Sequence, residues 1–301
     1  MSVDQAVITL FLVVVLALLL RPVEEACARW FGRHPGTIFA VPGALAGLFL
    51  IAMWGKGAHS LPLASLVAIY AFAPAFLAWI QGFGGAASGQ PPRGSWLDLA
   101  IILLLWLPLE LSLGRSFLPV PIQGLAHTAA YGVAVLLGLF LLLIFRRLGG
   151  MKYCLPTKAR DAGLPLAGFL VCAAVLIPLG RWLSFMGPFH MPAGASAGGV
   201  ATRFLAILAG IALPEEILFR SLIQNWLMQR FGSNNRTLFL AAVVFGAAHL
   251  NNAPFPFPDW RYMILATIAG FVYGKVFQRA TSVVSSAFLH ATVNTVRHLF
   301  F

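Results

Sequence analysis

The sequence predicts an all-α protein, a polytopic bundle of about eight to ten transmembrane helices. Of its 301 residues, 60% are hydrophobic and only 10% are charged, and the mean hydropathy is +0.88. A soluble domain carries roughly 25% charged residues, and even a large soluble fold needs a polar surface. The solvent of most of this chain is therefore lipid.

Ten apolar runs account for this composition. A helix needs about 20 apolar residues to cross the hydrocarbon, so some runs are marginal, and the short run at 237–250 is expected to be re-entrant or enclosed by neighbours. Runs of this length that are rich in Leu and Ala favour helices over barrel strands. The ten runs lie at 7–20, 38–53, 61–80, 97–113, 124–145, 163–183, 200–228, 237–250, 261–279 and 281–300.

The net charge of +11 is gathered in the connections between these runs. Arg146, Arg147, Lys152, Lys158 and Arg160 fall in one short polar connection, which is typical of a cytoplasmic loop under the positive-inside rule. This placement argues against nucleic acid as a partner, although a basic excess alone is one footprint of phosphate binding. Ten alternating spans would leave both termini on the non-cytoplasmic side.

Three ionisable groups interrupt the run at 200–228, where each charge costs about 2.5–3.5 kcal/mol on insertion scales and indicates function by default. Glu216 and Arg220 stand at i and i+4, so they share a helix face and are expected to pair. Glu215 is turned about 100° away from Glu216. Its own i+3 and i+4 neighbours are Leu218 and Phe219, so its helix supplies no counter-charge there.

Pro214 directly precedes this pair of glutamates. Proline lacks the N–H that would bond to the carbonyl of Gly210, so a kink in the helix is expected here. A carboxyl group in such a buried position is a candidate for acid–base chemistry near neutral pH. We therefore interpret Glu215 as functional and Glu216 with Arg220 as a supporting ion pair.

Two later runs also carry polar side chains. His249 ends the run at 237–250, after small residues at 246–248 that would let another helix approach closely. His290 and Asn294, at i and i+4, lie on one helical face of the last run. A single intramembrane histidine is as often a core residue as a functional one, but three polar clusters in successive apolar helices indicate one site.

The three patterns together resemble a known family. Glu-Glu-x-x-x-Arg at 215–220, Phe-x-x-x-His at 245–249 and His-x-x-x-Asn at 290–294, in this order on membrane helices, are similar to the motifs of the CPBP family. That family includes the type II CAAX prenyl endopeptidases and bacteriocin-processing or self-immunity relatives. The resemblance covers roughly residues 200–300. It implies N-terminal transmembrane helices of unknown role at 1–160 and a CPBP-like catalytic core at 161–301.

The resemblance implies intramembrane proteolysis without a cofactor. Glu215 and His249 would activate a water, as general base and water-orienting partner. His290 and Asn294 would form the oxyanion hole, where one donor is typically worth about 10²–10³ in rate. The expected partners are membrane lipid and a protein substrate with a membrane-proximal or C-terminal cleavage site, and the expected location is the bacterial cytoplasmic (inner) membrane.

Three alternatives remain open. The same glutamates and histidines would be able to hold Zn²⁺ with an open position for water, although no HExxH pair occurs and Asn294 is a poor zinc ligand. Buried Glu, His and Arg side chains also line the pathways of proton-coupled transporters. A non-catalytic scaffold that has kept the fold is the third alternative. Composition excludes a water-soluble peptidase.

The substrate itself is left open between a prenylated tail, a bacteriocin leader and the sorting tail of an exported protein. The alternation of ten spans would put His249 nearer the non-cytoplasmic face, which favours an exported substrate. Asn251, Asn252 and the Pro-rich stretch as far as Pro258 follow His249 directly, and we expect them to form a lip over the site.

Overall fold

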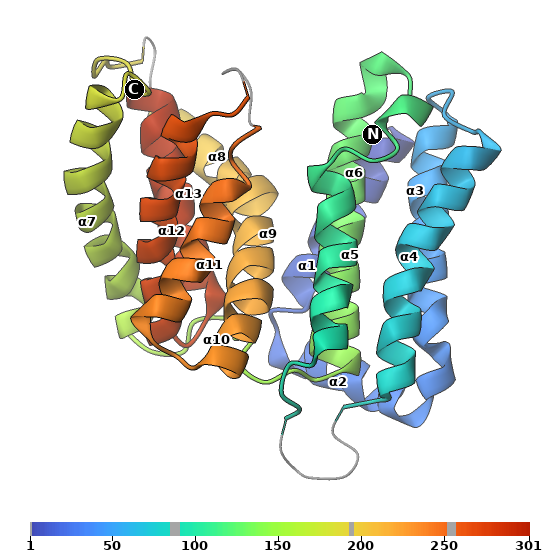
Figure 1. The fold of residues 1–301 in the computed structure, drawn as a ribbon. Helices are drawn as coiled ribbons and strands as arrows, with labels where there is room; N and C mark the ends of the chain where they lie inside the picture. The colour runs from blue at the N-terminus through green and yellow to red at the C-terminus, as the bar shows by residue number, and fades with distance from the viewer. Residues whose placement is uncertain (1, 85–90, 193–195, 252–256) are drawn as a thin grey trace. The chain divides into compact units, whose positions relative to one another are not determined.

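The computed structural model describes residues 2–84, 91–192, 196–251 and 257–301, and the regular elements within them are helices (Figure 1). The predicted all-α class is therefore confirmed. The chain divides into two compact units, Met1–Gly150 and Met151–Phe301. All ten apolar runs fall on helices. The assignment of an unknown role to 1–160 and catalysis to 161–301 concerns function and stays a prediction.

Unit 1 is a bundle around one buried helix. Its central segment, Val120–Phe145, has 72% of its apolar window buried, whereas Leu61–Gln81 has only 28% buried. The last seven residues of this segment, Leu139–Phe145, are π-helical. The helices of the unit are α1 (Val3–Ala17), α2 (Arg21–Arg33), η1 (Pro35–Phe39), α3 (Ala40–Trp54), α4 (Leu61–Gln81), α5 (Trp96–Glu110), η2 (Arg115–Phe117), η3 (Val120–Ile122), α6 (Gln123–Gly138) and η4 (Leu139–Phe145).

Polar side chains cap the N-termini of helices in this unit. Ser60 caps α4 by accepting a hydrogen bond from the backbone of Leu63. Ser95 and Asp98 form a reciprocal capping box at the start of α5, in which each side chain accepts from the other residue's backbone N–H. Such caps satisfy N–H groups that a helix leaves without partners at its first turn.

The segment 21–37 differs from the expected polar connection. It contains α2, which is bent by 97° from α1. Ala28 and Phe31 of α2 are buried, while its Arg and Glu side chains are not. An amphipathic helix that turns sharply from an apolar one has the character of an interfacial helix, lying along the membrane surface.

Unit 2 contains a long helix through 197–231 that carries Glu215 and Glu216. Two π-helical segments flank Pro214 along this helix, so the helix stays continuous through the proline and takes up the missing hydrogen bond by widening its turns. The helices of the unit are α7 (Arg160–Trp182), α8 (Ala197–Ile207), η5 (Leu208–Ala212), α9 (Leu213–Glu216), η6 (Ile217–Gln224), α10 (Asn225–Phe231), α11 (Asn235–Ala247), α12 (Trp260–Arg279) and α13 (Val283–Phe300).

Within the described residues, five helices are long and apolar enough to cross a membrane, or six if α1 and α2 form one span. This is fewer than the eight to ten spans predicted. Two of the predicted spans, α5 and α11, have only 15 and 13 residues, short of the roughly 20 that a perpendicular crossing needs. The five are Pro35–Trp54, Leu61–Gln81, Val120–Phe145, Arg160–Trp182 and Ala197–Phe231.

The connection before α7 fixes the turn between α12 and α13. The Lys152 ammonium donates to the carbonyl oxygens of Phe277, Gln278 and Ala280, at 2.8, 3.0 and 2.9 Å. These are carbonyls that the end of α12 leaves without helical partners. Burial lowers the pKa of Lys152, as expected for an ammonium removed from water. The Asp161 carboxylate accepts from the backbone N–H of the same turn, at Thr281 (2.9 Å).

We expect Lys152→Met to lower the free energy of unfolding by about 2 kcal/mol, because it removes three hydrogen bonds to a charged donor and leaves carbonyls without partners. The measurement is denaturant unfolding in detergent micelles. Lys158→Met, an exposed lysine in the same connection, is the matched control. Equal stability of the two variants would contradict the capping role of Lys152.

Candidate active site

Glu216 and Arg220 form an ion pair in the interior of unit 2. The Arg220 Nε donates to Glu216 Oε2 at 3.1 Å, and both side chains are fully buried. The pairing predicted from the i, i+4 spacing is therefore confirmed. Two opposite charges near the middle of the long helix are tolerated because each neutralises the other and satisfies its hydrogen bonds.

Arg220 also contacts the helices around it. Its Nη1 donates to Gln224 Oε1 at 3.3 Å, and Gln224 Nε2 donates to the Gly274 carbonyl of α12 at 3.1 Å. The guanidinium carbon lies 4.9 Å from the centre of the Phe245 ring of α11, a cation–π contact. The sequence analysis did not identify Gln224, although Glu216, Arg220 and Gln224 recur every four residues as a polar stripe on an apolar helix.

His290 of α13 lies between the two adjacent glutamates. Its Nδ1 is 3.2 Å from Glu216 Oε1, and its Nε2 is 3.8 Å from Glu215 Oε2. The Glu216 side chain is fully buried, whereas 23% of the Glu215 side chain is exposed. The two carboxylates thus differ in the way that the 100° rotation between them predicts: Glu216 faces Arg220, and Glu215 lies at a more open position.

His249 joins the cluster through Phe245. The Phe245 ring centre lies 4.7 Å from that of His249 and 5.8 Å from that of His290. The His249 Nδ1 is 2.8 Å from the Phe245 carbonyl oxygen. A carbonyl only accepts, so Nδ1 carries the proton of this bond and leaves Nε2 of the neutral ring as an acceptor. In the described part of the chain, no hydrogen bond joins His249 to Glu215.

Asn294 lies one turn beyond His290 on α13 and is half-buried. Among the described residues, no hydrogen bond joins it to His290 or to either glutamate. Arg297 continues the same stripe, and its guanidinium carbon lies 4.7 Å from the Tyr262 ring centre. Of the four predicted catalytic residues, the structure thus brings Glu215 and His290 together, puts His249 beside them through Phe245, and leaves Asn294 on the same helix face as His290.

Two tyrosines were missed by the sequence analysis. The Tyr273 ring stacks on His290, with centres 4.9 Å apart and an interplanar angle of 24°. The Tyr262 ring meets His249 edge-on at 4.6 Å. Each ring fixes the plane of a histidine. An isolated tyrosine in an apolar helix is usually interpreted as a core residue, so the sequence alone does not predict the contact of either tyrosine with a histidine.

Glycines let α11 and α12 pack closely around the site. A Cβ at Gly246 would clash with Thr267 Oγ1 and would lie 2.7 Å from the Met263 carbonyl oxygen. A Cβ at Gly270 would lie 2.7 Å from the Phe245 ring. The close approach predicted for the small residues 246–248 is confirmed at Gly246, whereas Ala247 is exposed. Phe245 therefore packs directly against α12 at Gly270.

Two expectations concern the surroundings of this cluster. The expected lip includes Asn252 and the stretch to 256, which lie outside the described residues. In the part of the chain that the structure describes, no group of three or more His, Cys, Asp or Glu side chains is arranged to hold a metal ion.

Fold and site together define an integral membrane protein whose helices gather carboxylates, histidines and an arginine in the membrane interior. Residues 197–296 match the family described as Type II CAAX prenyl endopeptidase Rce1-like. The matched region contains all three motifs, and it confirms the resemblance of this third of the chain to that family. No curated protein and no solved structure matches the chain.

We expect Arg220→Met to lower the free energy of unfolding by about 3–5 kcal/mol, because it leaves the Glu216 carboxylate buried without its counter-charge. The double variant Glu216→Gln/Arg220→Met should lose less than the single variant, since no uncompensated charge remains. Thermal and denaturant unfolding in micelles measure both, with the exposed Arg279→Met as the control. A double variant less stable than Arg220→Met would contradict the ion-pair interpretation.

Proposed function

We propose that the chain is a glutamic-type intramembrane endopeptidase that cleaves a peptide bond of a membrane-associated protein. The observation that carries the proposal is the position of His290 between two non-equivalent carboxylates, at 3.2 Å from Glu216 and 3.8 Å from Glu215. This arrangement lies within the region that matches an endopeptidase family. It combines a buried ion pair with a more accessible acid–base group, as hydrolysis in a water-poor interior requires.

Glu215 is the proposed general base. Glu216 is committed to Arg220, whereas 23% of the Glu215 side chain is exposed, and the proposal places the attacking water beside Glu215. Glu215 takes a proton from this water as the oxygen attacks the carbonyl carbon of the scissile peptide bond. The proton then passes to the leaving amine nitrogen as the C–N bond breaks, so no co-reactant besides water is needed. The acceptor Nε2 of His249 would orient the water.

His290 and Asn294 are the proposed oxyanion donors. The contact of His290 Nδ1 with Glu216 and the stacking of the ring on Tyr273 fix its orientation, so that Nε2 faces the Glu215 side. This role requires a proton on Nε2. The Asn294 amide, one turn along the same face, supplies the second donor. Preorganised donors of this kind stabilise a developing negative charge most strongly where water is scarce.

The substrate class remains a membrane protein segment: a prenylated tail, a bacteriocin leader or the sorting tail of an exported protein. A bacterial cytoplasmic membrane is the proposed location. A zinc-dependent reaction at the same glutamates and histidines is the alternative mechanism, and a chelator separates the two.

The decisive experiment is cleavage of candidate membrane substrates by the full-length protein in liposomes, with and without a chelator. We expect Glu215→Gln to abolish cleavage, Glu216→Gln to weaken it, and the surface variant Glu25→Gln to leave it unchanged, since Glu25 only pairs with Arg29 at the exposed surface. Loss of activity on chelation, with recovery on adding zinc, would favour the metal mechanism. Full activity of Glu215→Gln would overturn the proposed role of that residue.

Asn294→Ala should lower kcat by about 10²–10³-fold with little change in KM, because an oxyanion donor acts mainly on the transition state. Asn294→Asp keeps the shape but offers a carboxylate in place of the amide donor, and it should be at least as impaired. Initial-rate kinetics on the same substrate measure both. A change in KM alone would point to substrate binding instead of oxyanion stabilisation.

A further inference from the structure

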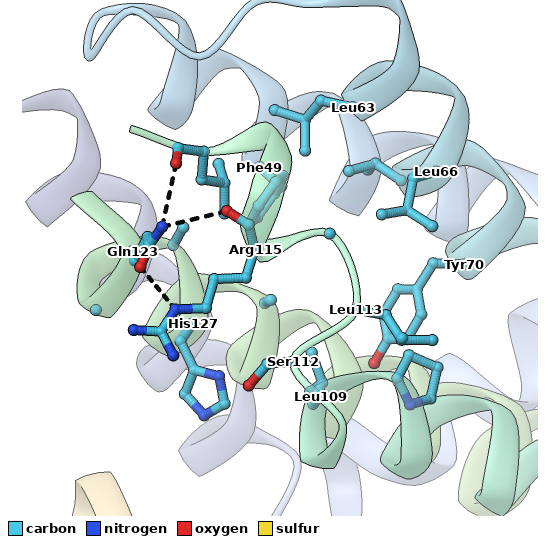
Figure 2. A pocket seen from close by; sticks show the side chains of 17 residues that line it. Phe49, Leu63, Leu66, Tyr70, Leu109, Ser112, Leu113, Arg115, Gln123 and His127 are labelled. Carbon is cyan, nitrogen blue, oxygen red and sulfur yellow. Dashed lines mark hydrogen bonds between the residues drawn. The ribbon is translucent and has the colours of Figure 1, made fainter. Parts of the chain in front are cut away.

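Unit 1 contains a cavity of about 300 Å³ at the end of the bundle where α5 passes into α6 (Figure 2). Its walls come from α3, α4, α5 and α6 and are mostly apolar, with Phe49, Leu63, Leu66 and Leu109 among the lining residues. This volume lies at the lower end of the range for sites that bind small molecules. The lining residues of this cavity all belong to unit 1, and none of them is a residue of the proposed protease site.

Polar side chains gather on one side of this cavity. Figure 2 shows Arg115, Gln123 and His127 together, across from Leu63, Leu66 and Tyr70. The Arg115 Nε donates to Gln123 Oε1 at 2.7 Å. The Gln123 amide in turn donates to the backbone carbonyls of Arg115 and Leu118, both at 3.3 Å. Gln123 therefore holds the guanidinium by one edge.

The guanidinium of Arg115 has no counter-ion within the described part of the chain. No carboxylate among the described residues lies within ion-pair distance of it, and its side chain is exposed. A positioned arginine binds phosphate or carboxylate through its remaining N–H groups. His127 lies one turn after Gln123 on α6 and lines the same cavity, so an anion at this position would meet two nitrogen-bearing side chains.

The segment that carries Arg115 has the character of a membrane interface. Four large apolar residues that flank it are exposed: Leu111 (65% exposed), Leu113 (58%), Phe117 (43%) and Val120 (78%). Both α4 and the segment Val120–Phe145 are candidate spans, and the cavity lies at the N-terminal ends of both. Exposed apolar side chains around an arginine at the end of a span are expected where lipid chains meet head groups.

We propose that this cavity binds one acyl chain of an anionic phospholipid, whose phosphate lies against Arg115 and His127. The apolar walls take the chain, and the Arg115–Gln123 pair supplies a fixed donor at its polar end. Most of the cavity wall is apolar, and the polar side chains lie on one side of it. This distribution favours an amphipathic ligand over a soluble metabolite. A basic pocket between transmembrane helices is the kind of site that selects anionic head groups.

The test uses the full-length protein in phosphatidylcholine vesicles that contain a phosphatidylglycerol analogue with a diazirine at the end of one acyl chain. After irradiation, the labelled peptides are identified by mass spectrometry. We expect labels at Phe49, Leu63 or Leu66 in the wild type. Arg115→Gln should reduce this labelling roughly tenfold, since it removes the charged hydrogen-bond donor to the phosphate.

Two further variants make the outcome decisive. Ala130→Phe, which fills the cavity from α6, should remove the cavity labels while Arg115 is intact. Arg33→Gln, an exposed arginine on α2, should leave them unchanged. Labels confined to the exposed face of α4 and insensitive to Arg115 would mean ordinary boundary lipid and overturn the proposal. Equal labelling by a matched phosphatidylcholine analogue would do the same. His127→Gln provides a second test of the head-group contact if Arg115→Gln fails to fold.

Discussion

The buried guanidinium of Arg220 joins the helical segments that make the candidate site. It pairs with Glu216 on its own helix, lies on the Phe245 ring of α11, and reaches α12 through Gln224. Through Glu216 it also orients His290 of α13. A charge in a membrane interior is stable only with its counter-charge and its hydrogen bonds in place. The same contacts that neutralise Arg220 therefore fix the positions of the three motif-bearing helices relative to one another.

This constraint explains why two consecutive glutamates have different environments. Only one of two adjacent residues on a helix faces a given neighbour, because each step rotates the side chain by about 100°. Glu216 takes the position facing Arg220 and is fully buried, so Glu215 necessarily points elsewhere, to a position where 23% of its side chain is exposed. The 100° rotation between adjacent residues thus explains both the buried position of Glu216 and the more accessible position of Glu215. His290 contacts both and couples the accessible group to the buried network.

The sequence predicted what depends on local spacing. The pairing of Glu216 with Arg220 follows from i, i+4 spacing, and all ten apolar runs are helical. It did not predict α2. The hydropathy of an amphipathic helix, averaged along the sequence, is that of a polar segment, although one face of the helix is apolar. Nor did it predict the stacking of Tyr273 on His290 or the π-helical segments beside Pro214. These depend on contacts between helices distant in the chain. The number of spans stays a prediction for a related reason: a hydrophobic run shows that a segment is buried, whether lipid or protein surrounds it.

A second buried pair, in unit 1, shows how position separates structural from functional charges. The sequence analysis assigned Arg146 to a cytoplasmic loop, yet it is buried and its Nε is 3.2 Å from Asp98 Oδ1. Its Nη1 also donates to the carbonyls of Gln81 and Gly82 at the end of α4. This pair lies where helices begin and end, so it satisfies backbone groups that any helix end leaves open. Glu216 and Arg220 lie near the middle of a 35-residue helix, where the backbone needs no such partners and the cost of a charge is greatest. The hydrogen bonds to helix ends therefore explain the Asp98–Arg146 pair. The Glu216–Arg220 pair has no such explanation, and we attribute it to the function proposed for the neighbouring Glu215 and His290.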